Sequence, residues 1–486
     1  MASTVSIQSQ TGPVVPIYLN FSFYGQDSWR ITRRLSLTYG LRYEINPPPH
    51  ALDDKDPATL IQVDDPKTFA LGPPGQRLWK TTYDNFAPRF GVHFQLSQKP
   101  GKETSVRGGY GLFYDLGNGV AGQAFNASFP YTGLRILRNI SFPVASTTDL
   151  LPPVGGSLPL LQLFAFDPEL KLPYSHQWNF AVEQSLGKSQ TISASYVAAL
   201  GRRLLREELL AGAILRGNPL FSAPSQVFVT RNSATSDYHS FQLRFQRRLT
   251  NNLQALSYYT WSHSIDTASN ESTQFGPALV FDPNRDRGSS DFDVRHSFNV
   301  ALTYDLPTPN ISKFGKAILG NWTVDTIVAV RSAQPVEVGS FRDLGFGVIF
   351  LRPDLIQGIP LYIDDGNVGG GQRFNRAAFV VPAQQRQGTL GRNVLRAFPL
   401  FQTDFGLARR FKLSETVGLE FKADFFNVFN HPNFGDPVGD LDDPRFGTSF
   451  RMFGKGLGTG GILGGLNPLY QVGGPRSMQL SLRARF

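Results

Sequence analysis

The chain has 486 residues, with 47 Lys and Arg against 38 Asp and Glu, a formal net charge of +9 and no Cys. No apolar run approaches the ~18–20 residues that a membrane-spanning helix needs, which excludes a helical membrane protein. The lack of Cys excludes a disulfide framework and thiol chemistry, and the basic residues occur without a polybasic run, so nothing indicates a nucleic-acid partner. Aromatic residues make up 13%, beside 48 Gly and 34 Pro, a composition typical of β-strands and loops.

The first twenty residues carry no pattern of a regular element, and we expect residues 1–20 to form an irregular start. They lack the basic segment, the apolar segment and the small-residue cleavage site of a secretory signal. We therefore expect that the chain as given does not export itself.

From residue 21 onward the sequence predicts strands in which apolar and polar residues alternate, as in LSLTYGLRYEI at 35–45. Neighbouring side chains of a strand point to opposite faces, so each predicted strand has one apolar and one polar face. The thirteen predicted strands are 21–31, 34–45, 86–96, 104–115, 175–186, 190–198, 238–249, 253–263, 294–304, 321–331, 403–413, 417–428 and 477–486.

Tight turns alternate with long connections along this series. The long connections are 46–85, 116–174, 199–237, 264–293, 332–402 and 429–476, all longer than most loops of compact domains. Outer-membrane barrels have short periplasmic turns, long external loops and strands of about ten residues, whereas a soluble β-sandwich or propeller has no reason to keep one end tight. The sequence thus predicts an all-β fold, an antiparallel transmembrane β-barrel of the outer-membrane receptor type. Residues 21–486 would form this barrel domain in the lipid of a Gram-negative outer membrane.

The number of predicted strands is odd, which a closed bacterial barrel does not allow, because its strands are even in number and both termini lie in the periplasm. We therefore expect further strands upstream of residue 21, and the chain to be the carboxy-terminal part of a larger barrel. Such a part could close by itself or keep unpaired strand edges.

Several stretches resemble a known family. They are FYGQDSWRITRRLSLTYGLRYE from Phe23, PYSHQWNFAVEQSLG from Pro173, SSDFDVRHSFNVALTYDLP from Ser289, LGNWTVDTIVAVRSAQP from Leu319, GRNVLRAFPLFQTDFGLARRFKL from Gly391, FKADFFNVFNHPNFGDP from Phe421 and GGPRSMQLSLRARF from Gly473. In order and spacing they resemble the barrel portion of TonB-dependent receptors of the Oar-like type, which carry carboxypeptidase-regulatory-like domains.

The resemblance implies a 22-stranded barrel with a plug, of which about 13 strands are present here. It implies a receptor that takes up a scarce external ligand, such as an iron chelate, a glycan or a peptide, with the TonB complex acting through the plug region. It also implies that the aromatic Phe486, at the end of the last strand, is the signal for the barrel-assembly machinery. Plug and signal sequence are not found in this chain, so a passive porin-like channel and a soluble β-rich binding module stay as alternatives.

Six arginines share the polar faces of the predicted strands, and we expect them to line the lumen: Arg42, Arg107, Arg244, Arg248, Arg483 and Arg485. They could hold plug carboxylates or guide an anionic ligand, or they could pair within the wall with Glu44, Glu183, Glu420 and Asp424. Aromatic residues that could form interfacial girdles are Tyr39, Tyr43, Trp178, Tyr259, Trp261 and Trp322. Buried packing explains some of them equally well.

No residue pattern indicates an enzyme or a cofactor. The acidic stretch with Asp282, Asp286, Asp291 and Asp293 could bind calcium, but its spacing is not that of an EF-hand, and we favour a solvated loop. The Gly-rich stretch 454–465 has no strand and helix around it, so we interpret it as a flexible loop rather than a phosphate loop. The seven His show no zinc spacing.

Overall fold

The computed structural model describes residues 2–12, 14–53, 55–127, 129–140, 150–155, 158–269, 283–310, 312–343, 348–383, 386–412, 414, 416–455 and 472–485. In this part of the chain, no helix has the length and apolar character needed to cross a membrane. Phe486, the predicted assembly signal, lies outside the described residues, as do Asp282 and most of the Gly-rich stretch.

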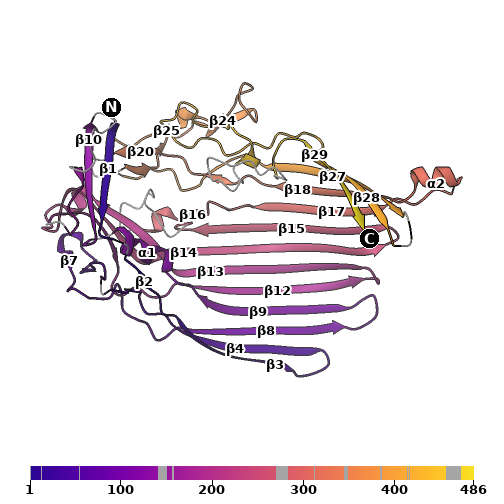
Figure 1. The fold of residues 1–486 in the computed structure, drawn as a ribbon, viewed down its shortest axis with the longest axis horizontal. Coiled ribbons are helices and arrows are strands. Elements are labelled where there is room, and N and C mark those ends of the chain that lie inside the picture. The colour runs from indigo at the N-terminus through magenta and orange to yellow at the C-terminus, as the bar shows by residue number, and fades with distance from the viewer. Residues whose placement is uncertain are drawn as a thin grey trace.

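One large antiparallel sheet dominates the molecule (Figure 1). Thirteen strands follow one another along it, each paired with its neighbours in chain order: β3 (Phe21–Arg30), β4 (Leu35–Ile45), β8 (Phe86–Ser97), β9 (Thr104–Tyr114), β12 (Tyr174–Leu186), β13 (Gln190–Ala211), β14 (Phe221–Thr250), β15 (Leu253–Asp266), β17 (His296–Asp305), β18 (Trp322–Arg331), β27 (Leu400–Lys412), β28 (Gly418–Phe426) and β29 (Ser477–Arg485). The thirteen predicted strands and the antiparallel fold class are thereby confirmed.

The remaining elements precede the first of these strands or lie in the connections between them. The other strands are β1 (Ala2–Gln10), β2 (Pro16–Ile17), β5 (His50–Ala51), β6 (Leu60–Ile61), β7 (Ala70–Leu71), β10 (Thr132–Ile140), β11 (Leu160–Phe166), β16 (Gly288–Ser289), β19 (Pro335–Val336), β20 (Ser340–Asp343), β21 (Val348–Leu351), β22 (Asp354–Leu355), β23 (Tyr362–Asp364), β24 (Gln372–Phe374), β25 (Phe379–Val380) and β26 (Leu395–Arg396). The α-helices are α1 (Asn118–Ala127) and α2 (Lys313–Leu319).

The pairing register puts the apolar residues of neighbouring strands on one face of the sheet and the polar residues on the other. Tyr39 lies opposite Phe90, whereas Gly40 lies opposite Arg89. The apolar face stays open to the surroundings, with Phe180 52% and Trp261 56% exposed. A wall with large exposed apolar side chains on one face and polar side chains on the other is what a lipid-facing barrel sheet requires.

The two ends of the sheet differ in construction (Figure 1). At one end, which we call the short-turn end, a few residues connect successive strands, and only the β17–β18 connection is longer and carries α2. At the opposite, long-loop end, β13 and β14 run on well past the predicted 190–198 and 238–249, and β11 pairs with β14 in parallel. Leu163 and Val227 pair there with no exposed surface, so burial extends strands that alternation alone did not reveal.

Residues 1–20, predicted to be irregular, instead contain β1 and β2, which pair with β10 and β5. They belong to the folded long-loop end, where distant connections pack on one another. One apolar cluster joins Phe125 of α1 to Phe164 of β11 and Phe228 of β14. Another joins Phe379 to Phe446, from two different connections. The long connections are therefore packed structure, and their partners come from far along the chain.

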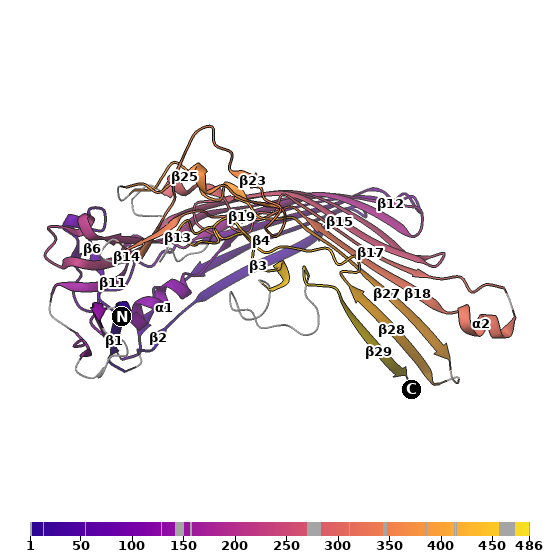
Figure 2. The same cartoon turned by 90° about the horizontal axis from the view of Figure 1, so that it is seen from above.

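The sheet arches but does not close (Figure 2). In the described residues, β3 and β29 each pair with one neighbouring strand, and every residue of both is exposed. All twelve pairings along the path are antiparallel. The first and the thirteenth strand therefore run in the same direction, so these two edges cannot join each other by antiparallel pairing.

Candidate functional site

The arginines singled out from the sequence share one face of the sheet but do not form a cluster. They come from β4, β9, β14 and β29, no two of which are neighbours. Three of them make ion pairs within the wall: Arg42 Nε with Glu44 Oε1 at 2.6 Å, Arg107 Nη2 with Glu183 Oε2 at 2.9 Å, and Arg485 Nη2 with Glu420 Oε2 at 3.4 Å.

Arg244 has neutral neighbours instead. Its Nη2 donates to Gln246 Oε1 at 2.7 Å, and its guanidinium lies 5.6 Å from the centre of the Tyr258 ring. The three ion pairs agree with pairing within the wall, Arg244 shows no such pairing, and a role of the arginines towards a plug or an anionic ligand stays a prediction.

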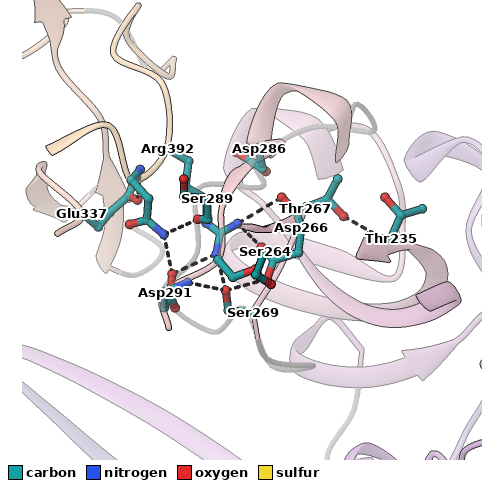
Figure 3. A network of polar contacts seen from close by, with 12 residues as sticks. Thr235, Ser264, Asp266, Thr267, Ser269, Asp286, Ser289, Asp291, Glu337 and Arg392 are labelled. Carbon is teal, nitrogen blue, oxygen red and sulfur yellow. Dashed lines mark hydrogen bonds and ion pairs between the residues drawn. The ribbon is translucent and has the colours of Figure 1, made fainter. Parts of the chain in front are cut away.

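A denser set of charges lies at the long-loop end, around the buried Arg392, which precedes β26 (Figure 3). Its Nη1 donates to the carboxylate of Asp266, and its Nη2 donates to Asp291 Oδ1 at 2.9 Å and to Ser269 Oγ at 2.6 Å. Asp266 ends β15 and Asp291 precedes β17, so one guanidinium links the β18–β27 connection to both sides of the β15–β17 connection.

Asn393, the next residue, adds further hydrogen bonds between the same two connections. Its Nδ2 donates to Asp291 Oδ1 and to the carbonyl oxygen of Ser289, both at 2.7 Å, and its backbone N–H donates to Glu337 Oε2 at 3.0 Å. Its φ is +56°, in the left-handed region that Asn tolerates better than most residues. The two segments approach so closely that a Cβ on Gly288 would lie 2.5 Å from the carbonyl oxygen of Arg392.

Asp286 ties in a third segment, the extension of β13. It pairs with Arg206 of β13 and, through Oδ1 at 2.8 Å, with Arg352, which follows β21. All three side chains are at most 5% exposed. A buried carboxylate between two guanidiniums is held in place by strong, charge-assisted hydrogen bonds.

Asp293 is the fourth aspartate of this set and has no exposed side-chain surface. Its Oδ2 accepts from Arg396 Nη2 at 2.8 Å and from Arg295 Nε at 3.2 Å. We refer to Asp266, Asp286, Asp291, Asp293, Glu337, Arg206, Arg352, Arg392, Asn393 and Arg396 as the loop network.

The loop network corrects the interpretation of the acidic stretch. Asp286 and Asp293 are buried rather than solvated, and Asp286, Asp291 and Asp293 all have arginine partners, which balance their charge in place of a metal ion. In the described part of the chain, no three His, Asp or Glu side chains are placed to hold a metal ion. The network therefore holds loops in position.

Glu337 is the network's most perturbed titratable group. Burial raises its pKa from 4.5 to about 7, against the opposing effect of the Arg352 and Arg392 guanidiniums. Its Oε1 lies 3.8 Å from Arg352 Nη1, too far for a strong hydrogen bond. The Glu337 carboxyl therefore changes from neutral to negative as the pH rises through about 7.

The sequence reasoning missed Arg206, Glu337, Arg352 and Arg392. The distances along the chain explain this, because Arg392 and Asp266 are 126 residues apart and Arg206 and Asp286 are 80 apart. The one local signal is LREELL at 205–210, in which Arg206, Glu207 and Glu208 interrupt an apolar run and are at most 3% exposed.

A hollow of about 730 Å³ opens at the short-turn end. Its lining includes Asp305, Trp322, Arg410, Glu420 and Arg485. Glu420 Oε2 accepts from Arg410 Nε at 3.0 Å. Of the arginines predicted to face the lumen, Arg485 is among the residues that line this hollow. Its position towards the lumen stays a prediction.

A family model described as "Outer membrane beta barrel domain" matches residues 1–455. No protein with a curated description matches the chain.

Among solved structures, the outer membrane transporter YddB from Escherichia coli is 11% identical with a TM-score of 0.49, covering 96% of this chain and 45% of that one. The ferripyoverdine receptor of the outer membrane of Pseudomonas aeruginosa is 9% identical with a TM-score of 0.44, covering 97% and 39%. The ferric-catecholate import receptor Fiu from E. coli K12 is 13% identical with a TM-score of 0.43, covering 96% and 44%. The chain spans less than half the length of each of these three.

Proposed function

Because the chain belongs to the outer membrane beta barrel domain family, we propose that it is the barrel part of a TonB-dependent receptor of the Oar-like type. The protein is located in the outer membrane, and in this proposal its short turns face the periplasm and its long loops face outside. In this proposal the long-loop end binds an external ligand, and the whole receptor, energised by the TonB complex through its plug region, admits the ligand. The role is binding and transport rather than catalysis.

The observation that carries this proposal is the loop network. It fixes the β15–β17 connection, the β18–β27 connection and the β13 extension to one another through buried charge pairs. Loops that are already ordered lose less conformational entropy when a ligand binds, which raises affinity. A passive channel has no need of such a fixed external surface. The stretches that resemble Oar-like receptors support the finer assignment.

Two further partners belong to the proposal. The barrel-assembly machinery would recognise the terminal strand through Phe486, and membrane lipid would cover the apolar face of the sheet. The ligand class is an iron chelate, a glycan or a peptide, as the resemblance implies.

The test uses the full-length protein that contains this chain, purified in detergent. Thermal unfolding is measured with pools of iron chelates, glycans and peptides, and the pool that raises the melting temperature is then followed in uptake by living cells. We expect uptake to stop when a protonophore removes the energy supply, and the purified protein to give no steady current in a planar bilayer. A steady, ligand-independent current with uptake that survives the protonophore would instead identify a passive channel.

A further inference from the structure

Three tyrosine–histidine pairs repeat with the same geometry on the apolar face of the sheet. In each, the phenol oxygen lies within hydrogen-bond distance of the histidine Nδ1, and the two rings stack at 6.0–6.2 Å with 22–28° between their planes. The pairs are Tyr110–His176 at 2.8 Å, Tyr196–His239 at 2.7 Å and Tyr259–His296 at 2.9 Å. Recurrence on three strand pairs indicates a feature of the wall rather than an isolated contact.

Each pair joins the two strands that enter and leave a connection at the long-loop end. The strand pairs are β9 with β12, β13 with β14, and β15 with β17, which are six consecutive strands of the sheet (Figure 1). In every case an aromatic residue lies directly opposite the tyrosine, and the histidine precedes this aromatic residue by two positions. The three aromatic residues are Trp178, Phe241 and Phe298. We call the three pairs the Tyr–His row.

The row is staggered in the way that tilted barrel strands require. In the pairing register His239 lies level with Trp178, two residues nearer the short-turn end than His176. His296 in turn lies level with Phe241, two residues nearer than His239. Each shift of two residues is spread over two strands, which is one residue per strand. This corresponds to a strand tilt of about 35°, the value expected for such barrels.

The short-turn end shifts in the same direction. Leu186, the last residue of β12, is level with Arg247 of β14 when the pairing is followed across β13. β14 itself ends three residues later, at Thr250. The row and the short-turn end are thus nearly parallel, and the Tyr–His row keeps one level along the barrel axis.

The distance of that level from the short-turn end matches the thickness of the apolar band of a membrane barrel. Ten residues separate His176 from the end of β12, eleven separate His239 from the end of β14, and nine separate His296 from the end of β17. Ten tilted strand residues span about 25 Å along the barrel axis, the height of the apolar band of outer-membrane barrels. The row therefore lies where the hydrocarbon of the external leaflet ends and its head groups begin.

The chemistry of the row suits an anionic head group. When tyrosine donates to Nδ1, the proton of the neutral imidazole is on Nε2, and in the described part of the chain the Nε2 atoms of His176, His239 and His296 have no hydrogen-bond partner. A phosphate ester offers only acceptors, so it selects this tautomer. Near His176, the exposed Arg203 guanidinium lies 5.4 Å from the centre of the Tyr174 ring, which itself contacts His176, and Arg203 makes no ion pair with any described residue.

We propose that the Tyr–His row is a binding site for the phosphate groups of lipid in the external leaflet, with the three Nε2–H groups as donors and Arg203 as a cation at one end of the row. The tyrosines are positioning residues that fix the histidine tautomer. This proposal rests on the location in the outer membrane and on the proposed orientation of the short turns towards the periplasm, and it does not depend on TonB or on the identity of a transported ligand.

The experiment refolds the full-length protein into phosphatidylcholine vesicles that contain a bis-phosphorylated glycolipid, or the same glycolipid without its phosphates. After extraction in mild detergent, native mass spectrometry counts the glycolipid retained per protein. We expect the wild type to retain the phosphorylated form several-fold better than the dephosphorylated form, and the His176→Gln, His239→Gln, His296→Gln variant to lose about fivefold of that retention. The matched control replaces three other histidines with Gln: His50, His93 and His431.

Equal retention of the two glycolipids by the wild type, or equal loss in the control variant, contradicts the proposal. Displacement by inorganic phosphate at a concentration equal to the glycolipid would identify a site for free phosphate instead and would also overturn it. If the triple variant does not assemble, the three single variants are measured, and each must lose part of the retention. The Tyr110→Phe, Tyr196→Phe, Tyr259→Phe variant separates positioning from packing, because it keeps the rings and is expected to lose retention while its melting temperature changes little.

Discussion

Arg392 is the residue on which the long-loop end depends most directly. Its guanidinium neutralises Asp266, which is fully buried, and contacts Asp291 and Ser269 as well. Removing one partner of a buried ion pair leaves an uncompensated charge, a far larger effect than losing an exposed pair. Its replacement is therefore the clearest test of the loop network.

We predict that Arg392→Met destabilises the long-loop end by about 3–5 kcal/mol. Because the strands below keep their pairing, the loss should appear as increased hydrogen exchange in the β15–β17 and β18–β27 connections, with little change in β12 and β13. The matched control is Arg445→Gln, which removes an exposed arginine paired with Asp443 at 2.7 Å. Equal exchange in the two variants would mean that the network does not hold the loops.

The second residue-scale prediction concerns pH. The pKa of Glu337 rises from 4.5 to about 7 on folding, so the folded state binds more protons than the unfolded state between these values. Stability must therefore fall as pH rises through this range, by on the order of 2 kcal/mol. We expect the melting temperature of Glu337→Gln to change less than that of the wild type between pH 5 and pH 8. Parallel pH profiles for the two proteins would rule out this role for Glu337.

At the scale of elements, the alternation within each strand decides which face meets lipid. Neighbouring residues of β14 illustrate this, because Leu243 lies opposite Tyr259 on the apolar face and Gln242 lies opposite Thr260 on the polar face. The same alternation continues across the sheet through the register, so a single strand already determines the character of both faces.

We predict that Leu243→Lys, near the middle of the membrane-spanning part of β14, destabilises the sheet by about 2–4 kcal/mol. Gln242→Lys, one residue away on the opposite face, should leave stability nearly unchanged. Both variants are compared by urea titration of the full-length protein in lipid vesicles. Similar midpoints would show that the face carrying Leu243 is not in contact with hydrocarbon.

At the scale of the whole molecule, the parity of the strands limits what the sheet can do. Thirteen antiparallel strands leave β3 and β29 running in the same direction, each with an open edge. Unpaired strand edges are templates for pairing with other strands, and a barrel removes them by closing. Strands beyond these thirteen would close the sheet in the usual antiparallel way only if their number is odd.

We predict that β3 and β29 do not become neighbours when this chain is refolded alone in detergent. The chain contains no Cys, so engineered Cys pairs give a clean background. Ala423→Cys with Leu480→Cys, which face each other across β28 and β29, should form a disulfide on oxidation. Phe23→Cys with Leu480→Cys should not form one within a monomer, and its rapid formation would show that the sheet closes on itself.

The thirteen strands, their two faces and the difference between the two ends follow from the sequence alone. These features depend on a period of two residues and on turn length, which are local properties of the chain. The odd strand count followed from the same pattern. The pairing of Arg42 with Glu44 could also be predicted from the sequence, because the two residues lie on the same face of one strand.

The fold of the long connections, in contrast, depends on tertiary contacts. The extensions of β13 and β14, the parallel pairing of β11 and the loop network depend on residues far apart in the chain, which no local pattern brings together. The same holds for the Tyr–His row, since each histidine meets its tyrosine across two strands joined by a long connection. Alternation fixes which face of a strand a side chain occupies, whereas pairing register and loop packing decide which side chains meet.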